Sequence, residues 1–191
     1  QREGRAKDSD DRTQESVLKM LNMGGPTAGR TTADIIENLR HMRIVPLAIS
    51  YEYDPCDYLK AKEFQCKRDI PGWKKAKQDD LDNMKTGIWG KKGHVHYQAA
   101  GCINDWLDTL DPTAIEKADI FRIVAEHIDH EIHKNYRIYD INRDALAGTT
   151  NAYIEERVKM VDVEHPDVPF LREKITAMYA NPLRNYEKAV D

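Results

Sequence analysis

The sequence predicts an α/β fold, in which a sheet flanked by helices is followed by a mostly helical tail. Two short apolar runs, 44–51 and 93–101, have the composition of strands and alternate with helical patterns within residues 1–110. Residues 111–191 show mostly helical periodicity. Apolar residues make up 40% of the 191 residues, which is enough for a hydrophobic core of ordinary size.

The first two helices are bounded by capping and chain-breaking residues. A helix is expected at 9–23, because Ser9 or Asp10 can cap it and a Gly-Gly-Pro sequence ends it. A second helix is expected to start near Thr31 or Thr32, with an acidic residue in its first turn that favours the positive end of the helix dipole.

The strands and later helices follow in order. The run at 44–51 is rich in β-branched and aromatic residues, which indicates a buried strand. In the run at 93–101, apolar and polar side chains alternate between the two faces. Because two strands are too few for a self-sufficient sheet, we expect further strands in preceding residues of a longer protein. Further helical patterns lie at 56–69, 73–85, 112–135, 149–161 and 169–186.

Charge and cysteine content argue against several classes of protein. Lys and Arg number 29 against 33 Asp and Glu, and this net charge of −4 argues against a nucleic-acid-binding protein. No apolar stretch approaches the about 20 residues that span a bilayer. Three cysteines without a CxxC pair favour a reducing compartment over a disulfide framework. The absence of an initiator Met and of a signal peptide indicates a chain that starts inside a longer protein or has been trimmed.

A glycine-rich segment at 24–31 offers one alternative function. It fits the phosphate-loop pattern except that Arg30 replaces the lysine, and such a loop would have to follow a strand. Because the preceding residues have helical periodicity, a connection between two helices is the favoured interpretation.

Three histidines offer a second alternative, a helical interaction or metal-binding module. His127, His130 and His133 recur every three residues on the polar flank of a predicted helix. Imidazole suits zinc, copper or nickel, but the spacing is one residue short of the HExxH motif of zinc peptidases. A solvated helix face is the favoured interpretation, and no metal site is assigned.

The opening residues have the composition of an anion site. Arg5 can bind a phosphate bidentately, Lys7 adds a point charge, and Gly4 permits close approach of the backbone. Glu3 would orient the arginines or bond a substrate hydroxyl. The acidic residues at 8–11 are expected to cap the following helix, whose dipole would favour the anion. On the pattern alone, a charged terminus remains an equal alternative.

The order of these segments resembles the glycerolipid acyltransferase superfamily. Glu3-Gly4-Arg5 holds the place of the family's third motif, a Glu-Gly followed by Ser, Thr or Gly and then Arg. Val45-Pro46-Leu47-Ala48-Ile49 matches the fourth motif, a Val/Ile-Pro strand. Residues 50–63 look closer to the glycerol-3-phosphate acyltransferase branch, and the strand at 93–101 resembles a late strand of the family.

This resemblance implies a fold and a reaction. Residues 1–110 would be the C-terminal portion of the acyltransferase domain, with its sheet flanked by helices, and 111–191 a helical appendage. The parent enzyme would move a fatty acyl group from acyl-CoA or acyl-carrier protein to glycerol 3-phosphate or 1-acylglycerol 3-phosphate in phospholipid synthesis. Arg5 and Lys7 would hold the acceptor phosphate in a pocket that Glu3 shapes.

The resemblance also implies further pocket residues and the lack of a catalytic motif in this chain. The pocket would be shaped further by Gly4 and walled by Val45 and Pro46. The family's catalytic His-x4-Asp motif is absent, so the chain is expected to carry no catalytic residue and to be inactive alone. The acyl donor is a co-substrate, and no cofactor is implied. The full-length protein is expected to be cytoplasmic and peripheral to the inner face of the cell membrane.

Overall fold

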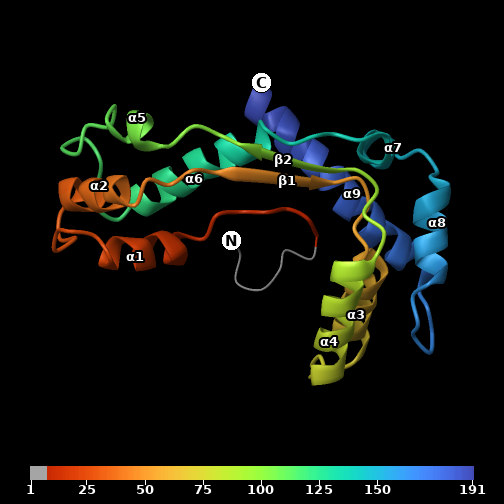
Figure 1. Cartoon of the computed structure of the whole chain (residues 1–191). Coiled ribbons are helices and arrows are strands. Elements are labelled where there is room, and N and C mark those ends of the chain that lie inside the picture. The colour runs from red at the N-terminus through yellow and green to blue at the C-terminus, as the bar shows by residue number, and fades with distance from the viewer. Residues whose placement is uncertain (1–7) are drawn as a thin grey trace.

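A computed structural model describes residues 8–191 as a mixture of helices with a small two-stranded antiparallel sheet. The sheet lies between two groups of helices: α1, α2 and α5 gather at one end of the molecule, and α3, α4, α7 and α8 at the other (Figure 1). In chain order the elements are α1 (Glu15–Met23), α2 (Thr32–His41), β1 (Leu47–Tyr51), α3 (Asp57–Asp69), α4 (Lys77–Trp89), β2 (Val95–Ala99), α5 (Asn104–Leu107), α6 (Ile120–His133), α7 (Asp140–Ala147), α8 (Ala152–Lys159) and α9 (Val168–Val190).

Both predicted strands are present and pair with each other. The register runs from Leu47 opposite Ala99 to Tyr51 opposite Val95. Strand β1 alternates between exposed and buried residues, so the prediction of a buried strand was wrong for one of its two faces. The buried face includes Ala48 and packs toward α6, whereas the apolar side chains of the other face stay 41–60% exposed among residues 8–191. The exposed apolar side chains of that face are Leu47, Ile49, Tyr51, Val95 and Tyr97.

Helix α1 starts six residues later than the sequence predicts. Ser9 has a φ of 56°, a left-handed conformation that a helix cannot contain, and no side chain caps α1 at Gln14. The acidic residues before it therefore do not cap the helix. Asp10 instead accepts a hydrogen bond from Asn185 in α9 and pairs with Arg12.

The glycine-rich segment connects two helices. It follows α1 rather than a strand, which removes the context that a phosphate loop requires. The loop wraps around the fully buried Asn38, which accepts a hydrogen bond from the Thr27 amide at 2.8 Å and donates one to the Asn22 side chain at 2.9 Å. A Cβ at Gly25 would lie 2.2 Å from the Asn38 side chain, so a residue without a side chain is needed there.

Helix α2 begins where the sequence predicts. The Thr31 hydroxyl accepts a hydrogen bond from the Asp34 amide, and the Asp34 carboxylate accepts one from the Thr31 amide. These two bonds and the one from the Arg30 amide hold the pKa of Asp34 below its usual value, since they favour the charged carboxylate.

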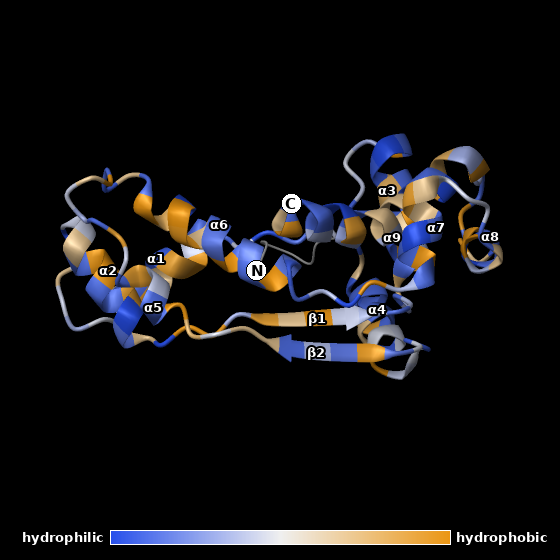
Figure 2. Cartoon of the chain, turned by 90° about the horizontal axis from the view of Figure 1, so that it is seen from above, coloured by the Kyte–Doolittle hydropathy of each residue, from blue (hydrophilic) through white to orange (hydrophobic). Residues whose placement is uncertain are grey.

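Two hydrophobic clusters form the core. The first joins α1 and α2 to α5 and α6 through residues such as Leu18, Leu39 and Val124. The second joins α3 to the last three helices through residues such as Ala61 and Leu171. Both clusters contain residues from either side of residue 110, so the helices that follow it pack in one body with the segments that precede it. Figure 2 shows apolar residues, in orange, along the helices at each end of the molecule.

Several boundaries differ from the prediction for local reasons. The long helix expected at 112–135 begins only at Ile120, because 111–119 form turns. Helix α7 was not predicted, and α5 was expected only as the short helix that follows the family's late strand; both are short. Helix α9 begins at Val168 with Pro169 in its first turn, where proline needs no hydrogen-bond partner, and it continues through Pro182.

Candidate functional site

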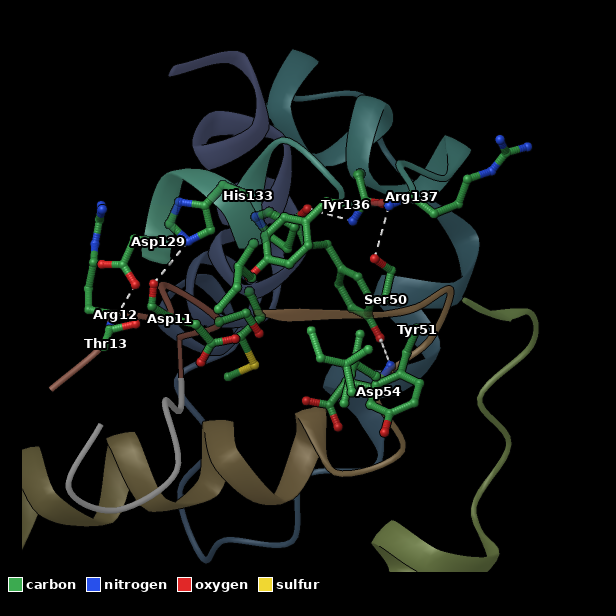
Figure 3. Close-up of a pocket in the computed structure, with 18 of the residues that line it drawn as sticks. Asp11, Arg12, Thr13, Ser50, Tyr51, Asp54, Asp129, His133, Tyr136 and Arg137 are labelled. Atoms are coloured by element: carbon green, nitrogen blue, oxygen red, sulfur yellow. Dashed lines mark hydrogen bonds between the residues drawn. The ribbon is translucent and has the colours of Figure 1, made fainter. Parts of the chain in front are cut away.

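A cavity of about 610 Å³ lies where four distant segments of the chain meet, between the residues that precede α1, strand β1, the C-terminal end of α6 and the middle of α9 (Figure 3). Its lining combines charged and hydroxyl-bearing side chains with apolar ones. The lining residues are Ser9, Asp11, Arg12, Thr13, Leu47, Ile49, Ser50, Tyr51, Asp54, Lys60, Asp129, Ile132, His133, Tyr136, Arg137, Asn142, Met178, Tyr179 and Pro182.

Residues 9–13 form one wall of the cavity and are held by hydrogen bonds to helices. The Thr13 amide donates to the Asp129 carboxylate of α6 at 2.7 Å. His133, at the end of α6, donates from Nε2 to the Asp11 carbonyl oxygen at 3.1 Å. On the other side, the Asn181 amide group of α9 donates to the carbonyl oxygen of Asp8 at 2.7 Å. The segment is therefore fixed in place although it has no regular secondary structure.

Strand β1 and the turn after it form the opposite wall. The Ser50 hydroxyl accepts a hydrogen bond from the Arg137 amide at 3.0 Å, which ties the strand to the segment after α6. Asp54 pairs with Lys60 of α3 at 2.5 Å, and its amide donates to the Tyr179 hydroxyl at 3.1 Å. The apolar side chains of β1 that reach the cavity include Leu47 and Ile49.

The ionisable groups of the cavity are perturbed mainly by burial. Desolvation raises the pKa of Asp11, although the positive charge of Lys60 acts in the opposite direction. Burial also raises the pKa of the Tyr136 hydroxyl, which stays protonated and can donate a hydrogen bond. The lining mixes cationic, acidic and hydroxyl-bearing side chains with apolar ones, so the cavity suits a ligand that has both a polar and an apolar part.

The predicted acceptor-binding residues precede this wall in the sequence. Glu3, Gly4, Arg5 and Lys7 lie outside the described residues 8–191, so their placement stays a prediction. Of the predicted wall residues, Val45 is half exposed and Pro46 is buried. Neither lines the cavity, since the strand reaches it only from Leu47 onward.

The three candidate histidines have three different surroundings. His127 stacks on the Trp106 indole with 3.7 Å between ring centroids, His130 is exposed, and His133 is buried. The expectation of a solvated face was therefore wrong for His133, because residues 8–13 cover that end of α6. Among residues 8–191, no group of three or more His, Cys, Asp or Glu side chains is placed to hold a metal ion.

Sequence reasoning did not find most of the cavity residues. Asp11 and His133 are 122 positions apart, and Asp54 and Tyr179 are 125 apart, so no local spacing connects them. The one available indication was the strand pattern, since a serine inside an apolar run, Ser50, needs a polar contact when it is buried.

Acidification is expected to destabilise the fold through His133. Burial lowers the pKa of this imidazole from 6.5, so the unfolded chain binds the proton more tightly than the folded one. The free energy of unfolding should therefore fall as the pH is lowered from about 7.5 to about 5.5. Urea unfolding at several pH values measures this slope.

The matched variants are His133→Gln and His130→Gln. The first should flatten the pH dependence, although His127, whose pKa burial also lowers, should leave a residual slope. The exposed His130 serves as the control and should leave the slope unchanged. An identical slope in the wild type and in His133→Gln would contradict the assignment of a buried, neutral His133.

Comparison of the chain with protein-family models, curated proteins and solved structures finds no match. None of the helices within residues 8–191 is both long and apolar enough to cross a membrane.

Proposed function

We propose that the chain is the C-terminal portion of a glycerolipid acyltransferase. One observation carries this proposal. Residues 9–13, which follow the Glu3-Gly4-Arg5 motif in the sequence, line the same cavity as strand β1, which begins within the Val45–Ile49 motif. Residues 9–13 and β1 are separated by a helix, a loop and a second helix, yet both reach one cavity that suits an amphiphilic ligand.

The proposed reaction transfers a fatty acyl group from the thioester of acyl-CoA or acyl-carrier protein to a hydroxyl of glycerol 3-phosphate or 1-acylglycerol 3-phosphate. The acceptor oxygen attacks the thioester carbonyl, an ester bond forms, and the C–S bond breaks to release the thiol. A His-Asp pair takes up the hydroxyl proton and returns one to the leaving sulfur. We place that pair in residues that precede Gln1 in the natural protein.

The residues of this chain bind and orient the acceptor. Arg5 and Lys7 hold its phosphate through charge-assisted hydrogen bonds, and Glu3 and Gly4 shape the pocket around it. The apolar side chains of β1 extend the site toward the acyl groups. The acyltransferase-type sheet is completed by strands outside this chain, since a two-stranded sheet is too small to be stable by itself. The partners are the acyl donor, the acceptor and the inner membrane surface, and nucleic acid is not among them.

The test begins with the natural coding sequence. An in-frame His-x4-Asp within the preceding hundred or so codons is expected. The full-length protein should transfer radiolabelled acyl groups to glycerol 3-phosphate or its 1-acyl derivative, and residues 1–191 alone should not. The absence of that motif, or measurable turnover by the 191-residue chain, would overturn the proposal.

A further inference from the structure

Helix α4 carries an uncovered apolar stripe at the surface. Leu81, Met84 and Ile88 follow one another at helical spacing, and all three are exposed. At the end of the helix Trp89 is 77% exposed, and Ile88 beside it is 65% exposed. Figure 1 shows that α4 and α3 project together from the rest of the molecule, so this stripe lies on a protruding part.

The other side of α4 is already occupied. Asn83 is buried against α3, where its side chain donates to the Glu63 carboxylate at 3.3 Å and its carbonyl oxygen accepts from the Cys56 thiol at 3.4 Å. A Cβ at Gly87 would lie 3.6 Å from the Cys56 sulfur, so this turn of the helix is also in close contact. Helix α4 therefore cannot rotate its apolar stripe inward without breaking these contacts, and the stripe is available to a partner outside the described chain.

Helix α4 itself contains two Lys and three Asp, but the segments on either side of it are rich in positive charge. Residues 67–92 contain eight Lys or Arg and four Asp, a formal charge of +4 in a chain whose net charge is −4. Some of these charges are compensated, as in the pairs of Lys75 with Glu63 and Asp80. Lys77 and Lys85, which flank the stripe, form no ion pair with the carboxylates of residues 8–191.

We propose that α4 docks on the surface of an anionic phospholipid bilayer, with its axis in the plane of the membrane. The Leu81–Ile88 stripe would enter the boundary between headgroups and acyl chains, Trp89 would lie at headgroup level, and Lys77 and Lys85 would contact anionic headgroups. The positive charge near α4, in a chain whose net charge is negative, favours an anionic surface as its partner. This inference rests on the proposed function and adds the surface by which the protein would contact the membrane. The observations that support it come only from α3 and α4.

Vesicle co-sedimentation of the 191-residue chain tests the proposal. Vesicles of phosphatidylcholine with about 30% phosphatidylglycerol should bind the chain, and vesicles of phosphatidylcholine alone should bind it more weakly. The triple variant Leu81→Ser/Met84→Ser/Ile88→Ser should lower the partition coefficient at least about tenfold. Lys77→Gln/Lys85→Gln should lower binding to the anionic vesicles about tenfold and leave binding to neutral ones unchanged.

A matched control removes apolar side chains elsewhere. Met20 and Met23 of α1 are 66% and 78% exposed and lie at the opposite end of the molecule, so Met20→Ser/Met23→Ser should bind vesicles as the wild type does. Circular dichroism and thermal unfolding should show that all variants remain folded. The tryptophan emission of the wild type should shift to shorter wavelength on binding, and Trp89→Phe should remove that shift.

Three results would overturn the proposal: no binding by the wild type, equal binding by the triple variant, or self-association of the wild type that the triple variant abolishes. The last would identify a second copy of the chain as the partner of α4. Vesicle binding is measured without any acyl-transfer reaction. A negative acyl-transfer assay would therefore not change the vesicle-binding result, and a negative vesicle-binding assay would not change the acyl-transfer result.

Discussion

Replacement of Arg157 by Met is expected to lower the free energy of unfolding by about 3–5 kcal/mol, because it leaves a buried carboxylate without its counter-charge. Asp57 is fully buried, and Arg157 Nε lies 2.5 Å from its Oδ1. The Tyr179 hydroxyl donates to the other carboxylate oxygen at 2.7 Å, and Arg157 also donates to the Pro55 carbonyl oxygen at 2.8 Å. The network thereby joins α3, α8 and α9.

The pH dependence of this variant gives a second measurement. Burial already raises the pKa of Asp57 in the wild type, where Arg157 opposes the shift. Without Arg157 that pKa should rise further above the unfolded value, so the folded variant binds the proton more tightly than the unfolded chain. The stability deficit should therefore be largest near pH 7 and should shrink as the pH falls through the folded pKa of Asp57.

Arg143→Met is the matched control. Arg143 pairs with Asp140 at 3.0 Å, but its side chain is 59% exposed and that of Asp140 is 98% exposed. Such a pair contributes at most about 1 kcal/mol, so this variant should unfold at nearly the same urea concentration as the wild type. Combining Arg157→Met with Asp57→Asn should recover part of the lost stability. A loss in Arg157→Met no larger than that in Arg143→Met would show that the buried pair does not stabilise the fold.

The parts of the fold that could be predicted are those that neighbouring residues determine. The start of α2 depends on Thr31 and Asp34, which are three positions apart and satisfy each other's backbone amides. The two strands could also be predicted from neighbouring residues, because each lies in a short apolar run. The start of α1 was predicted at Ser9 from an equally local pattern, but Asp10 and Asp11 make their contacts with α9 and α6 instead.

The cavity could not be predicted because its contacts join residues far apart in the sequence. No residue near His133 in the sequence indicates that residues 8–13 pack over it. The helical spacing of the three histidines therefore predicted a solvated position for it. The error for strand β1 is the opposite one. Its apolar run predicted burial on both faces, whereas one face is exposed. Whether Leu47 and Ile49 are covered depends on which segments lie opposite them. Residues 9–13 line the same cavity and still leave both side chains more than 40% exposed.

In the full-length protein, Arg5→Ala is expected to lower kcat/KM for glycerol 3-phosphate about 10- to 100-fold, the usual effect of losing a charge-assisted hydrogen bond to a phosphate. The loss should appear mainly as a higher KM for the acceptor, with the KM for the acyl donor unchanged. Arg5→Lys should recover part of the activity, since it keeps the charge without the bidentate geometry. Steady-state acyl-transfer kinetics with each substrate varied in turn separate these effects.

Two comparisons make the assignment specific to the phosphate. An acceptor that lacks the phosphate, such as glycerol, should react at the same low rate with the wild type and with Arg5→Ala, because no group remains for Arg5 to bind. The control variant is Arg122→Ala on α6, whose side chain is half exposed and pairs with Glu126 and Asp119 of its own helix surface. It should leave all kinetic constants unchanged. If Arg5→Ala affected both acceptors equally, Arg5 would be acting on the fold of the site and not on the phosphate.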